Sequence, residues 1–257
     1  MIDKDIQSRQ DNRNQKIDKV GVKDLKYPIV VQDRDNELQQ TIADIDIFVE
    51  LPHYNRGTHM SRFIEVLNKY HEKDLVENLP DILKTVKKKL TADRAYMNLK
   101  FPYFIKKRAP VSGIESLLSY DAFFLASYGE TFKLTIGVEV PITTVCPCSK
   151  EMSDYGAHNQ RSVVKVELNY DGFIWLEEVI EYVEQVASCE VYPLLKRVDE
   201  KYVTEKGYDN PKFVEDIVRD LALLLKNDGR ITAFKVSSEN FESIHNHNAY
   251  ACIEWEK

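Results

Sequence analysis

Strict alternation of apolar and polar side chains, repeated in separate parts of the chain, is the sequence feature that most constrains its fold. Residues 132–140 (FKLTIGVEV) place an apolar side chain at nearly every second position. Strand-like patterns recur in five further segments, at 41–51, 94–105, 162–170, 230–237 and 249–255. Because successive side chains of a strand point to opposite faces of a sheet, this period predicts strands with one buried face.

Apolar side chains at helical spacing follow the strands in pairs. The segments with this spacing are 63–70, about 80–90, 176–183 and 211–225, and Asn210 is the expected N-cap of the last one. The resulting order is a pair of strands, a pair of helices and a pair of strands, passed through twice. We therefore expect an α+β fold, with helices gathered on one side of antiparallel sheets.

The doubled order predicts three parts in the chain. These are a flexible N-terminal segment 1–16, a first module 17–128 and a second module 129–257 that carries most of the site residues. Each module is expected to form its own antiparallel sheet covered by a pair of helices. Such a sheet has two open edges that a neighbouring chain can complete, so we expect oligomerisation into a barrel.

Charge and composition narrow the class of partner. The 42 acidic and 35 basic residues give a net charge of −7, whereas nucleic-acid binders usually carry a basic excess. The chain has no apolar run near the ~18–20 residues of a membrane-spanning helix, and it begins without the apolar core of a signal peptide. Four cysteines are too few for a disulfide scaffold. We expect a soluble, reduced, cytoplasmic protein that binds neither nucleic acid nor membrane.

The connector between two expected strands, residues 146–162 (CPCSKEMSDYGAHNQRS), concentrates reactive side chains. It holds Cys146, Cys148 and His158, and thiolate with imidazole is a ligand set for a borderline-soft metal ion. Lys150 and Arg161 of the same segment suit an anionic substrate. A lone cysteine would more often be a small buried apolar residue. Two cysteines around a proline, near a histidine, favour a metal ligand or a nucleophile.

Three other clusters have both a functional and an ordinary interpretation. His245 and His247 in ESIHNHNAY share a site if the segment is extended, or are solvated histidines of a polar loop. Glu200 and Glu215 lie among basic side chains and form either site carboxylates or surface ion pairs, which contribute about 0–1 kcal/mol each. Arg62 in GTHMSRF stands at an expected helix start, where it suits either a phosphate or solvent.

Taken together, the motifs from residue 57 to residue 251 resemble those of the prokaryotic type IB GTP cyclohydrolases, which are similar to the GTP cyclohydrolase IV family. This resemblance implies the tunnelling fold, with two modules per chain and a homotetramer that has its sites at subunit interfaces. It implies conversion of GTP and water to 7,8-dihydroneopterin 3′-triphosphate and formate, the first step of tetrahydrofolate biosynthesis. In that reaction a metal-activated water attacks C8 of guanine.

The resemblance also implies roles for individual residues. Cys146, Glu200 and His245 match the ligands of a divalent metal, zinc or manganese, and His247 remains an alternative to His245. His158 matches a ligand or proton shuttle, and Glu215 matches the glutamate that anchors the guanine edge. Candidates for the triphosphate are Lys150, Arg161, Arg62, Lys196 and Arg197. Asn248 stands where the family often has aspartate. The sequence leaves open the physiological metal and whether the product feeds folate or modified tRNA bases.

Two other functions are compatible with parts of the pattern. A nitrile reductase with the same expected fold would use Cys146 as a covalent nucleophile with NADPH and no metal. A purine- or metal-binding oligomer without activity would keep the ligands and lose the chemistry. The paired histidines and the run AHNQRS favour the cyclohydrolase.

Overall fold

The structure is a computed structural model that describes residues 7, 9–70 and 75–257. The chain groups into two compact units, Met1–Phe101 with Phe123–Thr135, and Pro102–Ala122 with Ile136–Lys257. The predicted boundary after residue 128 falls inside the stretch that belongs to the first unit. No described helix has the length and apolar character needed to cross a membrane.

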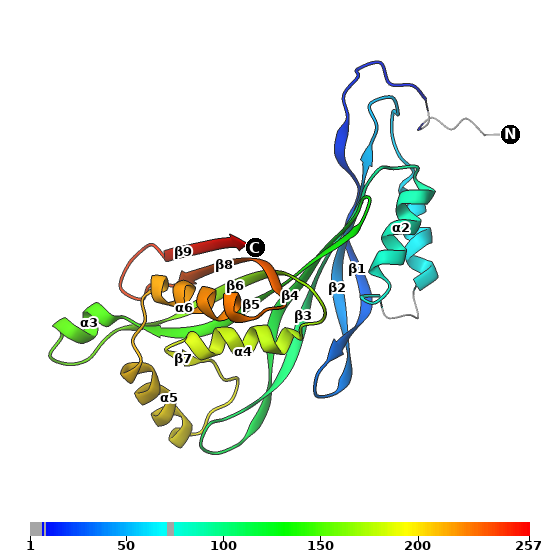
Figure 1. Cartoon of the computed structure of the whole chain (residues 1–257). Helices are drawn as coiled ribbons and strands as arrows, with labels where there is room; N and C mark the ends of the chain where they lie inside the picture. The colour runs from blue at the N-terminus through cyan, green and yellow to red at the C-terminus, as the bar shows by residue number, and fades with distance from the viewer. Residues whose placement is uncertain (1–6, 8, 71–74) are drawn as a thin grey trace. The chain divides into compact units, whose positions relative to one another are not determined.

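All described strands belong to one nine-stranded sheet in the order β1-β2-β3-β4-β5-β6-β8-β9, with β7 paired to β5. The strands are β1 (Ile17–Asp33), β2 (Glu37–Leu51), β3 (Ala95–Arg108), β4 (Glu115–Tyr128), β5 (Phe132–Val145), β6 (Asn159–Tyr170), β7 (Cys189–Glu190), β8 (Ile231–Asn240) and β9 (Ala249–Glu256) (Figure 1). The helices are α1 (Met60–Leu67), η1 (Asn68–Tyr70, 3-10), α2 (Leu79–Lys89), α3 (Pro147–Met152), α4 (Leu176–Val186), α5 (Arg197–Asp209) and α6 (Val214–Asn227).

The expectation of two modules with separate sheets is wrong, because strands from both halves of the chain form one continuous sheet. Three strands that sequence analysis missed, β1, β4 and the two-residue β7, contribute to it. In β1 the period of two is broken by register shifts between Ile17 and Val20 and between Val22 and Leu25. In β4 the consecutive residues Phe123 and Phe124 are both buried, which alternation does not predict.

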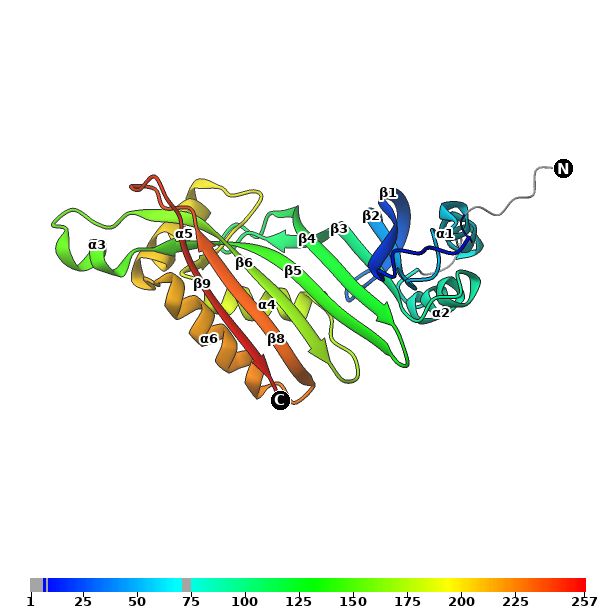
Figure 2. The same ribbon diagram turned by 90° about the horizontal axis from the view of Figure 1, so that it is seen from above.

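In the first unit, α1 and α2 lie beside strands β1–β3 (Figure 2). Their buried side chains are those with helical spacing, among them Phe63 of α1 and Ile82 of α2. Gly21 of β1 lies so close to β2 that an added Cβ would stand 1.9 Å from the carbonyl oxygen of Ile47. Only glycine fits there.

The described part of the N-terminal segment is tied to the first unit. Gln10 forms an isolated bridge with Asn55, and the backbone N–H of Asp11 donates to the carbonyl oxygen of Tyr54 at 3.0 Å. Residues 1–6 and 8 lie outside the described residues, so the predicted flexibility of 1–16 stays a prediction.

In the second unit, α4 and α6 cover one face of β5, β6, β8 and β9 (Figure 2). The buried residues of the strands are mainly valine, isoleucine and leucine at alternate positions, such as Val138, Val164 and Val236. Complete burial of such a side chain contributes roughly 1.5–3 kcal/mol. This face is the main apolar core of the unit, and the strand ends beside it carry the candidate site residues Cys146 and His158.

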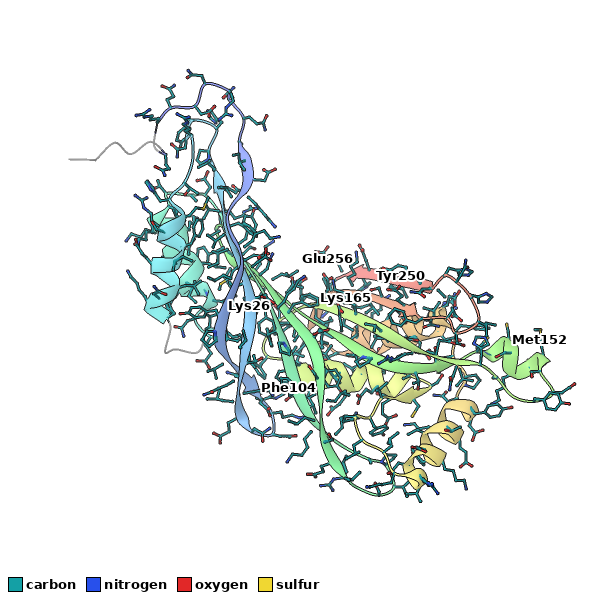
Figure 3. All side chains as sticks on the ribbon, turned by 180° about the vertical axis from the view of Figure 1, so that it is seen from behind. Lys26, Phe104, Met152, Lys165, Tyr250 and Glu256 are labelled. Carbon is teal, nitrogen blue, oxygen red and sulfur yellow. The ribbon has the colours of Figure 1, made fainter. Side chains whose placement is uncertain are left out.

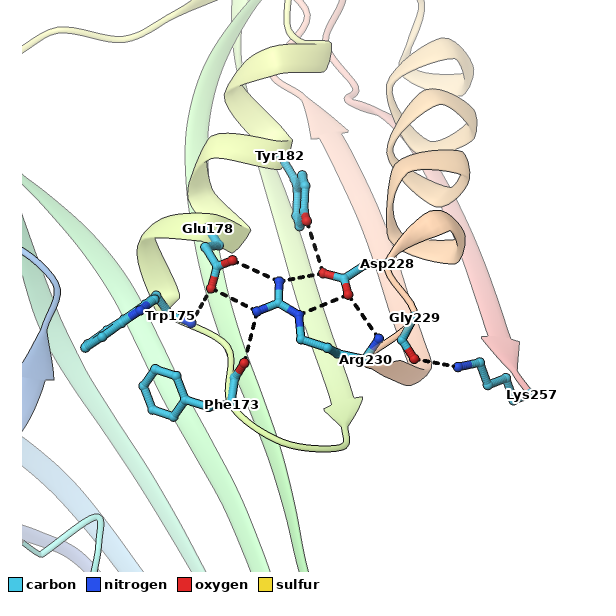
Figure 4. A network of polar contacts seen from close by, with 8 residues as sticks. All are labelled: Phe173, Trp175, Glu178, Tyr182, Asp228, Gly229, Arg230 and Lys257. Carbon is cyan, nitrogen blue, oxygen red and sulfur yellow. Dashed lines mark hydrogen bonds and ion pairs between the residues drawn. The ribbon is translucent and has the colours of Figure 1, made fainter.

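A charged network connects α4 with the C-terminal end of α6 (Figure 4). The guanidinium of Arg230 donates to Asp228 at 2.7 Å and to Glu178, in the first turn of α4, at 2.8 Å. The hydroxyl of Tyr182 donates to Asp228 at 3.1 Å. The hydrogen bond from Arg230 lowers the pKa of Asp228 to about 2, against a cost of burial that acts in the other direction.

Candidate functional site

The segment 146–162 begins where β5 ends and contains a short helix, α3, before β6 starts at Asn159. Cys146 is the N-cap residue of α3, and its Sγ accepts a long hydrogen bond from the N–H of Ser149 at 3.5 Å. Pro147 occupies the first turn, where its missing N–H costs nothing. The segment carries exposed side chains, with Met152 at the end of α3 81% exposed (Figure 3).

Backbone hydrogen bonds hold Cys146 next to His158. The N–H of Cys146 donates to the carbonyl oxygen of His158 at 3.1 Å. The hydroxyl of Ser149 donates to the carbonyl oxygen of Cys146 at 3.1 Å and accepts from the N–H of His158 at 3.2 Å. The two residues are twelve positions apart in sequence, and this circuit fixes both at the base of α3. Cys146 is partly buried and Cys148 is exposed, so the structure distinguishes the two thiols.

The imidazole of His158 contacts two further elements. Its Nδ1 lies 3.0 Å from Oε1 of Gln160 in β6 and 3.5 Å from the hydroxyl of Ser243. Ser243 belongs to the connector between β8 and β9, the segment that carries His245 and His247. The rings of these two histidines stack with centroids 5.0 Å apart, and both residues are exposed.

Asn248 anchors the same connector to β8. Its Nδ2 donates to Oε1 of Glu239 at 2.7 Å. An aspartate at this position would place two carboxylates in contact, so the amide suits the neighbour that this chain has.

Glu200 lies in the first turn of α5 and is exposed. Its neighbour Asp199 is completely buried and anchors this helix end. The Oδ1 of Asp199 accepts from the N–H groups of Val111 and Ser112 at 2.9 and 2.8 Å, and Oδ2 accepts from the hydroxyl of Ser112 at 2.6 Å and from the N–H of Lys196 at 2.8 Å. Burial raises the pKa of Asp199, but the hydrogen bonds, those from Ser112 foremost, outweigh it and hold the pKa well below the ordinary range.

Glu215 lies in the first turn of α6 and is exposed. The expected N-cap of this helix is wrong, because α6 begins at Val214 with Phe213 as its N-cap. Asn210 instead ends α5, and its Nδ2 donates to the carbonyl oxygen of Ala187 at 2.8 Å.

The basic residues proposed for the triphosphate lie in different surroundings. The ammonium of Lys150 donates to the carbonyl oxygen of Tyr208 and lies 4.3 Å from the centroid of the Tyr208 ring. Arg161 is exposed and lines a surface pocket of about 500 Å³ together with Gln160 and Ser243. Arg62 belongs to the first unit, where its guanidinium donates to the carbonyl oxygen of Lys89 at 3.3 Å.

The structure places some of the predicted site residues close together and others apart from them. Cys146 and His158 are adjacent, and His158 contacts the start of the histidine connector. Among the described residues, no three His, Cys, Asp or Glu side chains converge as the ligands of a metal ion would. Glu200 and His245 therefore do not complete a site around Cys146 within one chain of this structure.

Sequence reasoning missed two features. It did not identify Asp199 as a buried residue within the charged run that contains Glu200. It also missed a row of buried polar side chains beside His158, formed by Gln160, Thr144, Ser162 and Asn240. The available signal was their place in the strands, where they occupy inward positions that continue an apolar alternation.

Comparison with known proteins identifies close relatives. A family model described as type I GTP cyclohydrolase folE2 matches residues 4–251. A GTP cyclohydrolase FolE2 of Magnetococcus marinus is 59% identical over 251 residues, covering 97% of this chain and 95% of that protein. A GTP cyclohydrolase FolE2 of Geobacter sulfurreducens is 54% identical over 253 residues, covering 98% of both chains.

Solved structures of similar fold are urate oxidases. That of Bacillus subtilis 168 has a TM-score of 0.54 at 10% identity, covering 93% of this chain and 98% of that one. The uricase of Arthrobacter globiformis has a TM-score of 0.55 at 9% identity and 93% coverage of both chains. This likeness concerns the fold alone. It corrects the tunnelling-fold expectation of two tandem modules, because the matched architecture is one continuous antiparallel sheet of the urate oxidase kind.

Proposed function

Because this chain belongs to the type I GTP cyclohydrolase folE2 family and is therefore a hydrolase that acts on GTP, we propose that it converts GTP and water to 7,8-dihydroneopterin 3′-triphosphate and formate. This family replaces the type IB subtype that the sequence resemblance implied. The tunnelling fold that the resemblance implied is replaced by the urate-oxidase-like sheet. The structural observation that carries the proposal is the backbone hydrogen bond from Cys146 to His158, which places these two residues opposite each other at the adjacent ends of β5 and β6. We place the reaction at the first step of tetrahydrofolate biosynthesis.

The donor groups of the proposed site suit a divalent metal, zinc or manganese. Thiolate, imidazole and carboxylate are ligands that zinc accepts. Cys146 is partly buried, and the single hydrogen bond that its Sγ accepts is long, so its lone pairs remain available. We propose Cys146, Glu200 and His245 as the ligands. When bound there, the metal would lower the pKa of a bound water toward about 7, which supplies the nucleophile for C8 of guanine.

His158 is the proposed proton carrier. An imidazole nitrogen with a lone pair can accept a proton from water and return it to a nitrogen of the opening ring. Its position beside Cys146 supports this role, since a proton carrier must lie within hydrogen-bond reach of the reacting groups.

Recognition of GTP is assigned to exposed residues. Glu215 as a carboxylate can accept two N–H bonds from the guanine edge, and adenine lacks that pair of donors. We assign the triphosphate to Lys150, Arg161 and Arg62, because guanidinium and ammonium groups form strong charge-assisted bonds with phosphate.

We further propose that the working form is a homotetramer in which neighbouring chains complete each site. The strands β1 and β9 end the sheet order of the chain, and open sheet edges favour pairing with another chain. The ligands proposed here come from three separate elements that do not converge within the described part of one chain.

The test is incubation of the purified protein with GTP and either manganese or zinc, with and without a chelator. We expect formate together with a pterin that becomes fluorescent on oxidation, and we expect the chelator to abolish both. Turnover that is insensitive to chelator and dependent on NADPH would instead indicate a nitrile reductase with Cys146 as nucleophile.

A further inference from the structure

A row of buried polar side chains leads from His158 into the sheet of the second unit. The Nδ1 of His158 lies 3.0 Å from Oε1 of Gln160, whose Nε2 donates to the hydroxyl of Thr144 at 2.9 Å. The hydroxyls of Thr144 and Ser162 are 3.0 Å apart, and Ser162 donates to Oδ1 of Asn240 at 2.7 Å. We call these four residues, Gln160, Thr144, Ser162 and Asn240, the polar row. All four are buried.

The strand register explains why the row forms. Thr144 of β5 pairs directly with Gln160 of β6, and Ser162 of β6 pairs directly with Asn240 of β8. Each occupies an inward position, on the face where β5, β6 and β8 otherwise bury apolar residues such as Val164. A buried polar group without a partner costs about 1–3 kcal/mol, and here each member bonds to the next. The row is therefore a satisfied network at the end of the apolar core nearest His158.

The direction of each hydrogen bond follows from the orientation of Asn240, whose Oδ1 faces the hydroxyl of Ser162, and from the number of protons available. A hydroxyl has one proton to donate. Ser162 gives its proton to Asn240, so the proton between the two hydroxyls comes from Thr144. Thr144 must then accept from Gln160, which turns the amide nitrogen of Gln160 toward Thr144 and its carbonyl oxygen toward His158.

A carbonyl oxygen can only accept, so the ring nitrogen that faces Gln160 must carry a proton. We propose that Gln160 is a positioning residue, through which the polar row fixes neutral His158 in the tautomer protonated at Nδ1. The Nε2 of His158 then keeps its lone pair and is the nitrogen that takes a proton or a metal ion. This consequence for catalysis rests on the proposed function, whereas the tautomer does not.

Ser243 gives an internal control for this assignment. Its hydroxyl also approaches Nδ1 of His158, but at 3.5 Å and from an exposed position. A hydroxyl can donate or accept, so it does not select a tautomer. Removing it should leave the ring unchanged.

The direct test is NMR detection of the histidine ring nitrogens in metal-free protein labelled with ¹⁵N-histidine. The spectra are recorded about 1.5 pH units above the ordinary imidazole pKa of ~6.5, where a histidine ring is neutral. His158 is assigned from the signals lost in His158→Gln. We expect its Nδ1 to be of the protonated type and its Nε2 of the unprotonated type. A His158 protonated at Nε2 would overturn the inference.

Variants of the row sharpen the test. Thr144→Val keeps the shape and removes the hydroxyl, which frees the Gln160 amide to turn, so both tautomers should appear. Thr144→Ser keeps the hydroxyl and should restore the single tautomer, and Ser243→Ala should keep it. A single unchanged tautomer in Thr144→Val and in Gln160→Leu would overturn the inference.

Kinetics separate this inference from the proposed function. With GTP, Gln160→Leu should lower kcat by about 10- to 100-fold, the usual range for residues that orient a ligand or base, with little change in KM. If the wild-type protein does not convert GTP, the proposed function is wrong. The tautomer measurement would still decide the inference about Gln160. If a variant does not fold, the tautomer measurement on the wild-type protein decides the inference by itself.

Discussion

The backbone N–H of Cys146 donates to the carbonyl oxygen of His158 at 3.1 Å, so the two residues hold each other in place across the base of α3. This contact extends the pairing of β5 with β6 by one step beyond Val145 and Asn159. Cys146 and His158 thus lie at rigid strand ends, although the connector between them, which contains α3, is exposed. Rigid support of this kind suits reactive groups that need a fixed geometry.

The two cysteines of the CPC motif should differ sharply on substitution. Cys146→Ala removes a proposed metal ligand and should lower both bound metal and kcat/KM for GTP by about 100-fold or more. Cys148 is exposed, so Cys148→Ala is the matched control and should change neither. Metal content by elemental analysis and formate release measure the two effects. Equal behaviour of the two variants would remove Cys146 from the site.

Asp199 should matter for stability more than a surface carboxylate does. Asp199→Ala leaves the N–H groups of Val111, Ser112 and Lys196 without their acceptor, so we expect a loss of about 2–4 kcal/mol in the free energy of unfolding. Ser112→Ala removes only the hydroxyl bond to Oδ2 of Asp199 and should cost about 1 kcal/mol. Urea unfolding of both variants checks the prediction. A change below about 0.5 kcal/mol for Asp199→Ala would show that the buried carboxylate is not an anchor.

Acid should weaken the network around Arg230. The pKa of Asp228 is lowered to about 2 in the folded chain by the hydrogen bond from Arg230, from its ordinary value of 3.8. A lowered pKa stabilises the fold above the unfolded value, and this contribution is lost as the pH falls from about 4 to about 2. We expect a loss of about 1–2 kcal/mol from this group.

The variant Asp228→Asn isolates that contribution. Its free energy of unfolding should be lower than that of the wild type at pH 6, and it should fall less between pH 4 and pH 2. Denaturant unfolding across this pH range measures both quantities. Parallel pH profiles for the two proteins would contradict the role assigned to Asp228.

Gly21 tests the close approach of β1 to β2. A Cβ at this position would stand 1.9 Å from the carbonyl oxygen of Ile47, so Gly21→Ala must displace a strand backbone and should cost about 3 kcal/mol or more. An added Cβ at Gly229 meets no atom within 4 Å, which makes Gly229→Ala the control with little expected change. Thermal unfolding compares the two, and equal midpoints would argue against this strand pairing.

The sequence predicted the regular parts of the second unit because they repeat a single period. The expected strand 132–140 corresponds to β5 and 162–170 to β6, and the expected helix from Leu176 is α4. The irregular elements were not predicted from the sequence, for physical reasons. β1 contains register shifts, and β4 buries two consecutive phenylalanines. The helix α5 buries only Asp199 and Gly207, so it lacks the apolar stripe by which a helix is found.

The candidate site was predictable only where it follows from strand order. Cys146 and His158 flank one connector between paired strands, so their proximity follows from the antiparallel pairing of β5 with β6. The positions of Glu200 and His245 relative to them depend on how α5 and the β8–β9 connector pack, which no local pattern specifies. The polar row was visible as polar residues at inward strand positions, but its hydrogen bonds depend on a register that only the structure provides.

The central claim, that this enzyme opens the imidazole ring of GTP, is tested most directly with GTP carrying ¹³C at C8. We predict that all of the label leaves as formate, with one formate formed for each dihydroneopterin triphosphate. Label that remains in the purine product, or consumption of GTP with release of phosphate and no labelled formate, would contradict the account.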